Sequence, residues 1–161
     1  MLLLAGAVAV AVLAGVVVVG LRVVGDDDPN WAEQATAACE RGLVESRGAV
    51  AASRSVAPVE QRALHLFTAA TEIESTVLAE LLSLPQPAAD ELAIGRALEI
   101  IAEAHDDDLV LIDRLRRKFD VKLFEQRVNA AVPVSEDLRR RFESLGADGC
   151  VRYYDPASYA T

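Results

Sequence analysis

An uninterrupted apolar run from Leu2 to Leu21 is the feature that most constrains this chain. The run, LLLAGAVAVAVLAGVVVVGL, contains no charged and no polar side chain over twenty residues. At a rise of about 1.5 Å per residue, a helix of this length matches the roughly 30 Å hydrocarbon core of a bilayer. The sequence therefore predicts a transmembrane helix and makes the lipid bilayer, through residues 2–21, the first expected partner. The chain beyond Gly25 is then expected to lie on one side of the membrane.

The same run has a second interpretation, as a secretory signal that is cleaved. The apolar part of a signal peptide usually spans about 7 to 15 residues, and this run is longer, which favours a retained anchor. Cleavage before Asp26 stays open, because Val23 and Gly25 are small enough for the two positions that a signal peptidase reads. No cysteine closes the run, which argues against a bacterial lipoprotein. Retention predicts a single-pass membrane protein, and cleavage near Gly25 predicts a secreted one.

Two features disagree about which side of the membrane holds the rest of the chain. Arg22 follows the run directly, and by the positive-inside rule it would keep that end in the cytoplasm. The two cysteines, Cys39 and Cys150, favour the other side, because an even number in an export-like chain is typical of a disulfide. The alternative is a pair of buried free thiols in a cytosolic domain. We expect a Cys39–Cys150 disulfide and an extracytoplasmic domain.

Charge excludes one class of partner. The formal net charge is −9, and nearly all charged residues lie beyond Gly25. A domain of this sign repels phosphate backbones and anionic headgroups, so no nucleic-acid binding is expected.

The first three helices are predicted from caps, breaks and apolar spacing. Asn30 with Glu33 resembles an N-cap with its capping-box partner, and a helix is expected from about Trp31 to Ser53. Trp31 is either a core residue or an anchor near the membrane surface. The second helix is expected over about 58–84, ended by the sequence PQP, and the third from 88–90 to at least 118.

Apolar side chains at steps of three or four predict the buried faces of the second and third helices. On the second helix, which we expect to be central, they are Leu66, Ala70, Ile73, Val77, Leu81 and Leu84, widened by Leu64, Phe67, Thr71, Leu78 and Leu82. On the third helix they are Leu92, Leu98, Ile101, His105, Leu109, Ile112, Leu115 and Phe119.

The last part of the chain is expected to be more broken. A short helix is predicted over 121–131 and closed by Pro133, followed by a final helix over 136–145 that Ser135 caps. Gly146 is placed to end that helix in the left-handed conformation. The tail, 151–161, is expected to be an irregular strap or disordered.

These elements predict an all-α fold: an N-terminal transmembrane helix followed by an antiparallel bundle of four or five helices. Short connections favour up-and-down neighbours. The expected organisation is an anchor or signal segment over 1–25, an extracytoplasmic bundle over 26–150 and the tail over 151–161.

Several short motifs carry a resemblance. The apolar segment, an acidic linker, WAEQATAACERGL, a helix ending in LPQP and a last helix ending in SLGADGC occur in that order. This order resembles a group of exported or membrane-anchored actinobacterial proteins, which are small helical domains with one early and one late cysteine. The resemblance implies the bundle and the Cys39–Cys150 bridge, and it brings no catalytic residues.

The polar residues predict no catalytic site. Glu103 and His105 are two residues apart, so the Glu and His spacing of a di-iron bundle is absent. His105 is expected to be a core histidine and His65 an exposed one. The side chains of Glu72 and Glu74, and those of the acidic triplet 106–108, are expected to diverge around their helices. No nucleophile, phosphate-loop or zinc-protease motif occurs.

The sequence therefore predicts a non-enzymatic, membrane-tethered extracytoplasmic bundle with no cofactor and no metal site. Its expected role is structural or in protein interaction, with an envelope protein or a second copy as partner. The alternative is a bundle that carries or senses an apolar ligand, haem or a metal ion.

Overall fold

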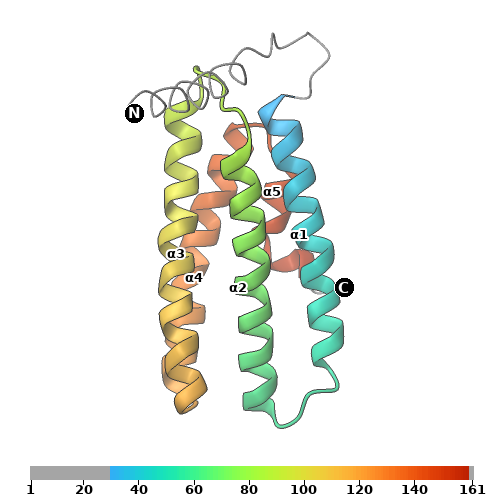
Figure 1. Cartoon of the computed structure of the whole chain (residues 1–161), viewed down its shortest axis with the longest axis vertical. Coiled ribbons are helices and arrows are strands. Elements are labelled where there is room, and N and C mark those ends of the chain that lie inside the picture. Colours follow the sequence, from blue (N-terminus) through green and yellow to red (C-terminus); the bar gives the residue numbers. More distant parts are fainter. Residues whose placement is uncertain (1–29, 160–161) are drawn as a thin grey trace, which may run out of the picture.

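The computed structural model of the chain describes residues 30–159, which form an all-α bundle without strands (Figure 1). Five α-helices are followed by one 3₁₀ turn: α1 (Trp31–Ser53), α2 (Val59–Ser83), α3 (Glu91–Arg117), α4 (Val121–Ser144), α5 (Asp148–Tyr153) and η1 (Pro156–Tyr159). The predicted all-α bundle is confirmed. The predicted transmembrane segment, 2–21, lies outside the described residues, and among residues 30–159 no helix is long and apolar enough to cross a membrane.

The four long helices run alternately up and down (Figure 1). α1 packs on α2, α2 on α3 and α3 on α4, as their short connections favour. The short α5 packs on both α1 and α4. It therefore closes the ring of helices, but only along the half of the bundle where α1 begins and α4 ends (Figure 1).

The start of α1 follows the sequence closely. The side chain of Asn30 accepts a hydrogen bond of 3.0 Å from the backbone N–H of Glu33, so the predicted N-cap is confirmed. Trp31 is 5% exposed, which makes it a core residue. The predicted bounds of the first three helices agree with the structure to within about one turn.

The predicted break at Pro133 is wrong, because α4 continues through it as one helix. Pro133 and Asn129, whose carbonyl loses a helical hydrogen bond to the proline, are both exposed, so water can satisfy the free carbonyl. Ser135 is therefore inside a helix and caps nothing. The N-cap of α4 is Asp120, whose carboxylate accepts from the N–H of Leu123 at 3.1 Å.

The tail is more ordered than the sequence suggested. α5 extends past the expected boundary at residue 150, and Tyr153 and Tyr154 are both buried. Gly146 has φ 71°, which confirms the left-handed turn predicted after the last long helix.

The predicted buried face of α3 is confirmed in part. Leu92 and Leu109 are 88% and 49% exposed, whereas Ile94 and Ala97 are fully buried. At 100° per residue, Leu92 points about 200° away from Ile94, so it cannot share that face. Four predicted core positions of α3 are buried as expected: Leu98, Ile101, Ile112 and Leu115.

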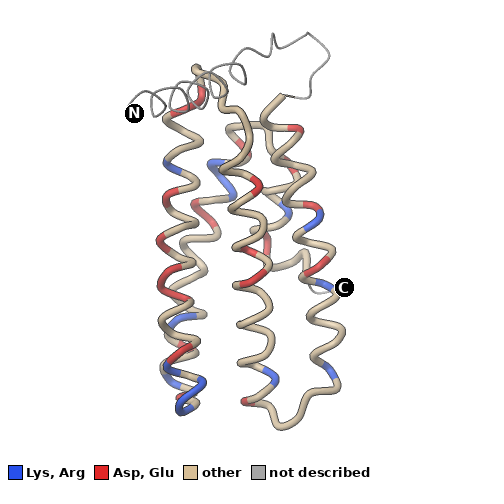
Figure 2. The backbone as a smooth tube through the Cα atoms, in the orientation of Figure 1, with Lys and Arg blue, Asp and Glu red and all other residues tan. Residues whose placement is uncertain are grey.

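Basic residues gather along the chain where α3 ends and α4 begins (Figure 2). Arg114, Arg116, Arg117 and Lys118 are all exposed, and Arg117 pairs with Asp113 at 2.6 Å. The cluster is a solvated helix end that complements the helix dipole.

α5 docks on α1 through a disulfide and a close approach of the two backbones. The disulfide joins Cys39 of α1 to Cys150 of α5 with Cα atoms 4.9 Å apart, which confirms the predicted pairing. Next to it, the N–H of Gly149 donates to the hydroxyl of Thr36 at 3.2 Å. A Cβ at Gly149 would lie 2.3 Å from the carbonyl oxygen of Thr36, so only glycine allows this approach.

We therefore expect Gly149→Ala to lower the free energy of unfolding by about 3 kcal/mol, because α5 must move away from the backbone of α1. Gly95→Ala is the control: a Cβ added there would have no neighbour within 4 Å, and alanine in an exposed helix is expected to add about 0.5 to 1 kcal/mol. Urea denaturation followed by Trp31 fluorescence measures both. Equal stability of Gly149→Ala and the parent chain would contradict this docking.

Candidate functional site

A cleft of about 640 Å³ opens in the bundle. Its walls come from the second half of α1, from α4 and from the first half of α2. Side chains of α5 and η1 close one end. The cleft exists because α5 is too short to fill the space between α1 and α4 along the whole bundle. A volume of this size is typical of sites for small molecules.

Most of the cleft wall is apolar. The rings of Phe67 and Phe124 meet edge to face with centroids 5.7 Å apart. The aliphatic side chains that line the cleft are Ala49, Val50, Ala63, Leu66, Ala70, Val128 and Ala131. Leu66 and Phe67, which the sequence placed in a packed core, are only half-buried because this part of the bundle is open.

A small group of ionisable side chains interrupts this wall. Nε of Arg127 lies 2.5 Å from Asp108, and a terminal nitrogen of Arg127 donates to the carbonyl of Ala104 at 3.0 Å. Both charged side chains are largely buried, at 16% and 14% exposure. Glu74 accepts one long hydrogen bond, 3.4 Å, from the hydroxyl of Tyr154.

Glu74 is the most perturbed carboxyl group of the site. Burial raises its pKa from 4.5 to about 7, and repulsion from Asp108 adds to the shift. The hydrogen bond from Tyr154 and the charge of Arg127 act in the opposite direction without cancelling it. Burial also raises the pKa of Asp108, despite its pairing with Arg127. Near neutral pH, both the protonated and the ionised form of Glu74 are therefore populated.

Three tyrosines close the end of the cleft near α5. Tyr153 and Tyr154 meet edge to face at 5.0 Å, and Tyr154 stacks on Phe142 of α4 at 5.7 Å. The hydroxyl of Tyr159 donates to the carbonyl of Tyr153. Burial raises the pKa of all three phenols, that of Tyr159 to about 12, so they stay neutral donors.

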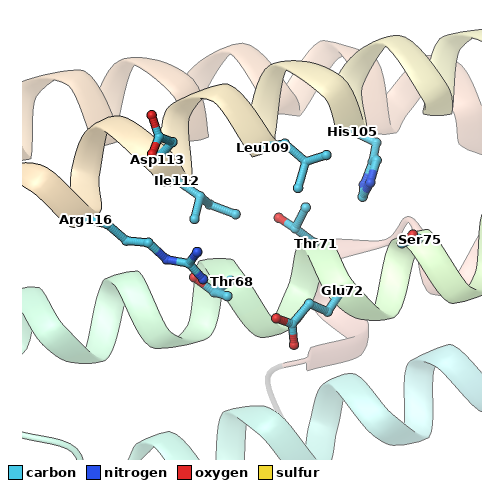
Figure 3. Close-up of a pocket in the computed structure, with 9 residues that line it drawn as sticks. All are labelled: Thr68, Thr71, Glu72, Ser75, His105, Leu109, Ile112, Asp113 and Arg116. Atoms are coloured by element: carbon cyan, nitrogen blue, oxygen red, sulfur yellow. The ribbon is translucent and has the colours of Figure 1, made fainter.

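A second, smaller cavity of about 320 Å³ lies between α2 and α3 (Figure 3). His105 points from α3 toward Thr71 and Ser75 of α2, and Arg116 extends toward Thr68 (Figure 3). Nδ1 of His105 is buried and has no hydrogen-bond partner within residues 30–159. His105, which the sequence predicts to be a core histidine, is half-buried and lies at the wall of this cavity.

The other polar residues considered from the sequence do not form a site. His65 is exposed and lines neither cavity, so it does not meet His105. Glu72 and Glu74 diverge as expected, into the smaller cavity and the cleft respectively. Asp106 and Asp107 are exposed. In the part of the chain that the structure describes, no three His, Cys, Asp or Glu residues could hold a metal ion together.

Sequence reasoning missed the group formed by Glu74, Asp108 and Arg127, although each carries a recognisable signal. Each is a charged residue inside the apolar stripe of its helix: Glu74 falls between Ala70 and Val77, and Arg127 between Phe124 and Ala131. A charge on a core-facing position requires a partner or a cavity. Three such positions on three neighbouring helices indicate a shared polar site.

Comparison with known proteins adds no functional evidence: no family model, no curated protein and no solved structure matches this chain. The chemistry of the cleft therefore carries the functional argument. An apolar cavity with a few convergent polar groups and a perturbed carboxyl is the usual form of a ligand site.

The pKa of Glu74 predicts a pH-dependent effect of Glu74→Gln. A folded-state pKa above the unfolded one means that the parent chain loses stability as the pH rises from 4.5 to 7, because ionisation is unfavourable in the cleft. Glu74→Gln is expected to be about as stable as the parent at pH 4 and about 3 kcal/mol more stable at pH 8. Urea denaturation at both pH values measures this, with Glu72→Gln as the exposed control. A stability difference that does not change with pH would contradict the assignment.

Proposed function

We propose that this protein is a membrane-tethered bundle that carries or senses a small apolar ligand in the cleft. The observation that carries the proposal is the cleft itself: about 640 Å³ with walls of aliphatic and aromatic side chains. Folding normally removes such space, because interiors are close-packed and unfilled apolar volume destabilises a protein. A bound ligand would restore the contacts that this half of the bundle lacks.

The tether is part of the same proposal. Residues 2–21 are proposed to span the membrane once, with the bundle on the extracytoplasmic side; cleavage before Asp26 would release the same bundle as a secreted protein. The Cys39–Cys150 disulfide supports this side, because structural disulfides persist in oxidising compartments. The relationship to actinobacterial two-cysteine proteins is proposed on the same arrangement of cysteines.

A second candidate is the structural or interaction role expected from the sequence. Val128 and Val132, one turn apart on α4, are 46% and 48% exposed, and Val128 also lines the cleft. Exposed apolar side chains beside a cleft could contact an envelope protein or a second copy. This role is favoured if the chain sediments as a dimer and if small molecules do not shift the NMR signals of the residues that line the cleft.

The proposed placement predicts that protease added to intact cells will degrade the bundle. Complete protection, with degradation only after the cells are opened, would contradict the extracytoplasmic side. A cytoplasmic protein with no membrane association serves as the control for cell integrity.

The binding proposal predicts that an uncharged apolar probe enters the cleft. The full chain is reconstituted in lipid discs with ¹³C-labelled alanine methyl groups and titrated with 1-naphthylmethanol. Signals of Ala49, Ala63 and Ala131 are expected to shift, while Ala79, which lines no cavity, stays unchanged. Reading protein signals separates binding in the cleft from partition into lipid.

A matched pair of variants tests the location of binding. Ala70→Phe fills the cleft and is expected to weaken binding at least about tenfold, as the loss of an apolar pocket would. Ala79→Phe makes the same change on the same helix outside the cleft, and it is expected to leave binding unchanged. The proposal would be overturned if the probe shifted none of the cleft signals in the parent chain. It would also be overturned if Ala70→Phe bound the probe as tightly as the parent chain does.

A further inference from the structure

The cleft is polarised along its length. On α2, its wall runs from Ala63, Leu66 and Phe67 at one end to Glu74 at the other, about 16 Å at 1.5 Å per residue. The first end is apolar, and the second holds Glu74 with the hydroxyl of Tyr154. A molecule that fills the cleft along its length therefore needs an apolar body and one polar end.

The charges of the cleft decide the sign of that polar end. The charge of Arg127 is already balanced, since Arg127 pairs with Asp108 at 2.5 Å and also donates to the carbonyl of Ala104. Among the described residues, Glu74 receives one hydrogen bond, the 3.4 Å contact from Tyr154, which leaves acceptor capacity free. With both carboxyl groups ionised, the cleft carries one excess negative charge.

We propose that the natural ligand of the cleft is an amphiphile with a protonated amine, and that the carboxylate of Glu74 is its counter-ion. This inference rests on the proposed ligand-binding function. An ammonium group would donate to the free acceptor positions of Glu74 and relieve its repulsion from Asp108. The rings that line the cleft add a second attraction, because aromatic faces attract cations.

Other ligand charges fit less well. A carboxylate or phosphate would meet Glu74 and Asp108, while the one guanidinium of the cleft is already paired. An uncharged ligand would leave the ionised form of Glu74 without a counter-charge in an apolar cavity, which is unfavourable. Asp108 is less suited than Glu74 to hold the amine, because Arg127 already neutralises it.

The inference also predicts how binding depends on pH. An amine binds the ionised form of Glu74, so its affinity is expected to rise about tenfold from pH 6 to pH 8. From α1, Ser46 lines the cleft, and the charges of Glu45 and Arg47 act on Tyr153 and Tyr159. The titratable and charged groups that face Glu74 from the other elements are Asp108 of α3, Arg127 of α4, Tyr153 and Tyr154 of α5 and Tyr159 of η1.

Three probes with the same ring system test the inference: 1-naphthylmethylamine, 1-naphthylmethanol and 1-naphthoate. The full chain in lipid discs is titrated with each at pH 8, with the methyl signals of the cleft alanines as the readout. The amine is expected to bind about tenfold more tightly than the alcohol, and naphthoate most weakly. Glu74→Gln is expected to remove the advantage of the amine over the alcohol, so that the two bind with similar affinity. Glu72→Gln is the matched control and is expected to bind all three as the parent does.

The outcomes separate this inference from the proposed function. If the alcohol binds in the cleft as tightly as the amine, the cleft is a ligand site and the amine inference is overturned. If the advantage of the amine survives in Glu74→Gln, the assignment of Glu74 as counter-ion is wrong. If none of the three probes shifts the cleft signals, both the inference and the proposed function fall.

Discussion

The rest of the structure depends on the docking of α5 against α1. A six-residue helix has too few hydrogen bonds to persist alone, so its position is set by tertiary contacts. The disulfide closes a loop with a sequence separation of 111 residues, which in the chain-entropy model stabilises the fold by about 4 to 5 kcal/mol. Gly149 brings the two backbones together, and an ion pair between Arg152 and Glu40 lies on the exposed side of the same contact.

The cleft is a consequence of the same docking. α5 fills the space between α1 and α4 in one half of the bundle, where the main core lies around Leu81, Ile101 and Phe142. η1 extends this cover by a single turn, tied to α1 through Arg47, whose Nε donates to the carbonyl of Ser158 at 2.9 Å. Further along the bundle, side chains of α1, α2 and α4 border the cleft.

The sequence predicts the long helices well, because their caps and apolar spacing are local properties. The bounds of α1 and the turn at Gly146 follow from such signals, whereas the disulfide follows from the even number of cysteines in an export-like chain. The error at Pro133 shows where local rules fail: the stripe Phe124, Val128, Ala131, Leu138, Phe142 keeps one helical phase across the proline, and packing along it outweighs one missing hydrogen bond. The site was harder to predict, since Glu74, Asp108 and Arg127 meet only after three helices have packed. A charge within each apolar stripe was nevertheless visible.

The raised pKa of Glu74 follows from its place in the cleft, which the helices leave unfilled. In a fully packed bundle, a carboxyl group at this position would need a salt bridge, as Asp108 has with Arg127. In open water its pKa would be ordinary. Glu74 has neither environment: it lies at an apolar cavity wall, with one long hydrogen bond and a neighbouring like charge. Such a group gains most from a cationic ligand, because the ligand supplies the partner that the fold withholds. The stability lost by burying this carboxyl with only one long hydrogen bond is therefore the physical source of the binding selectivity we infer.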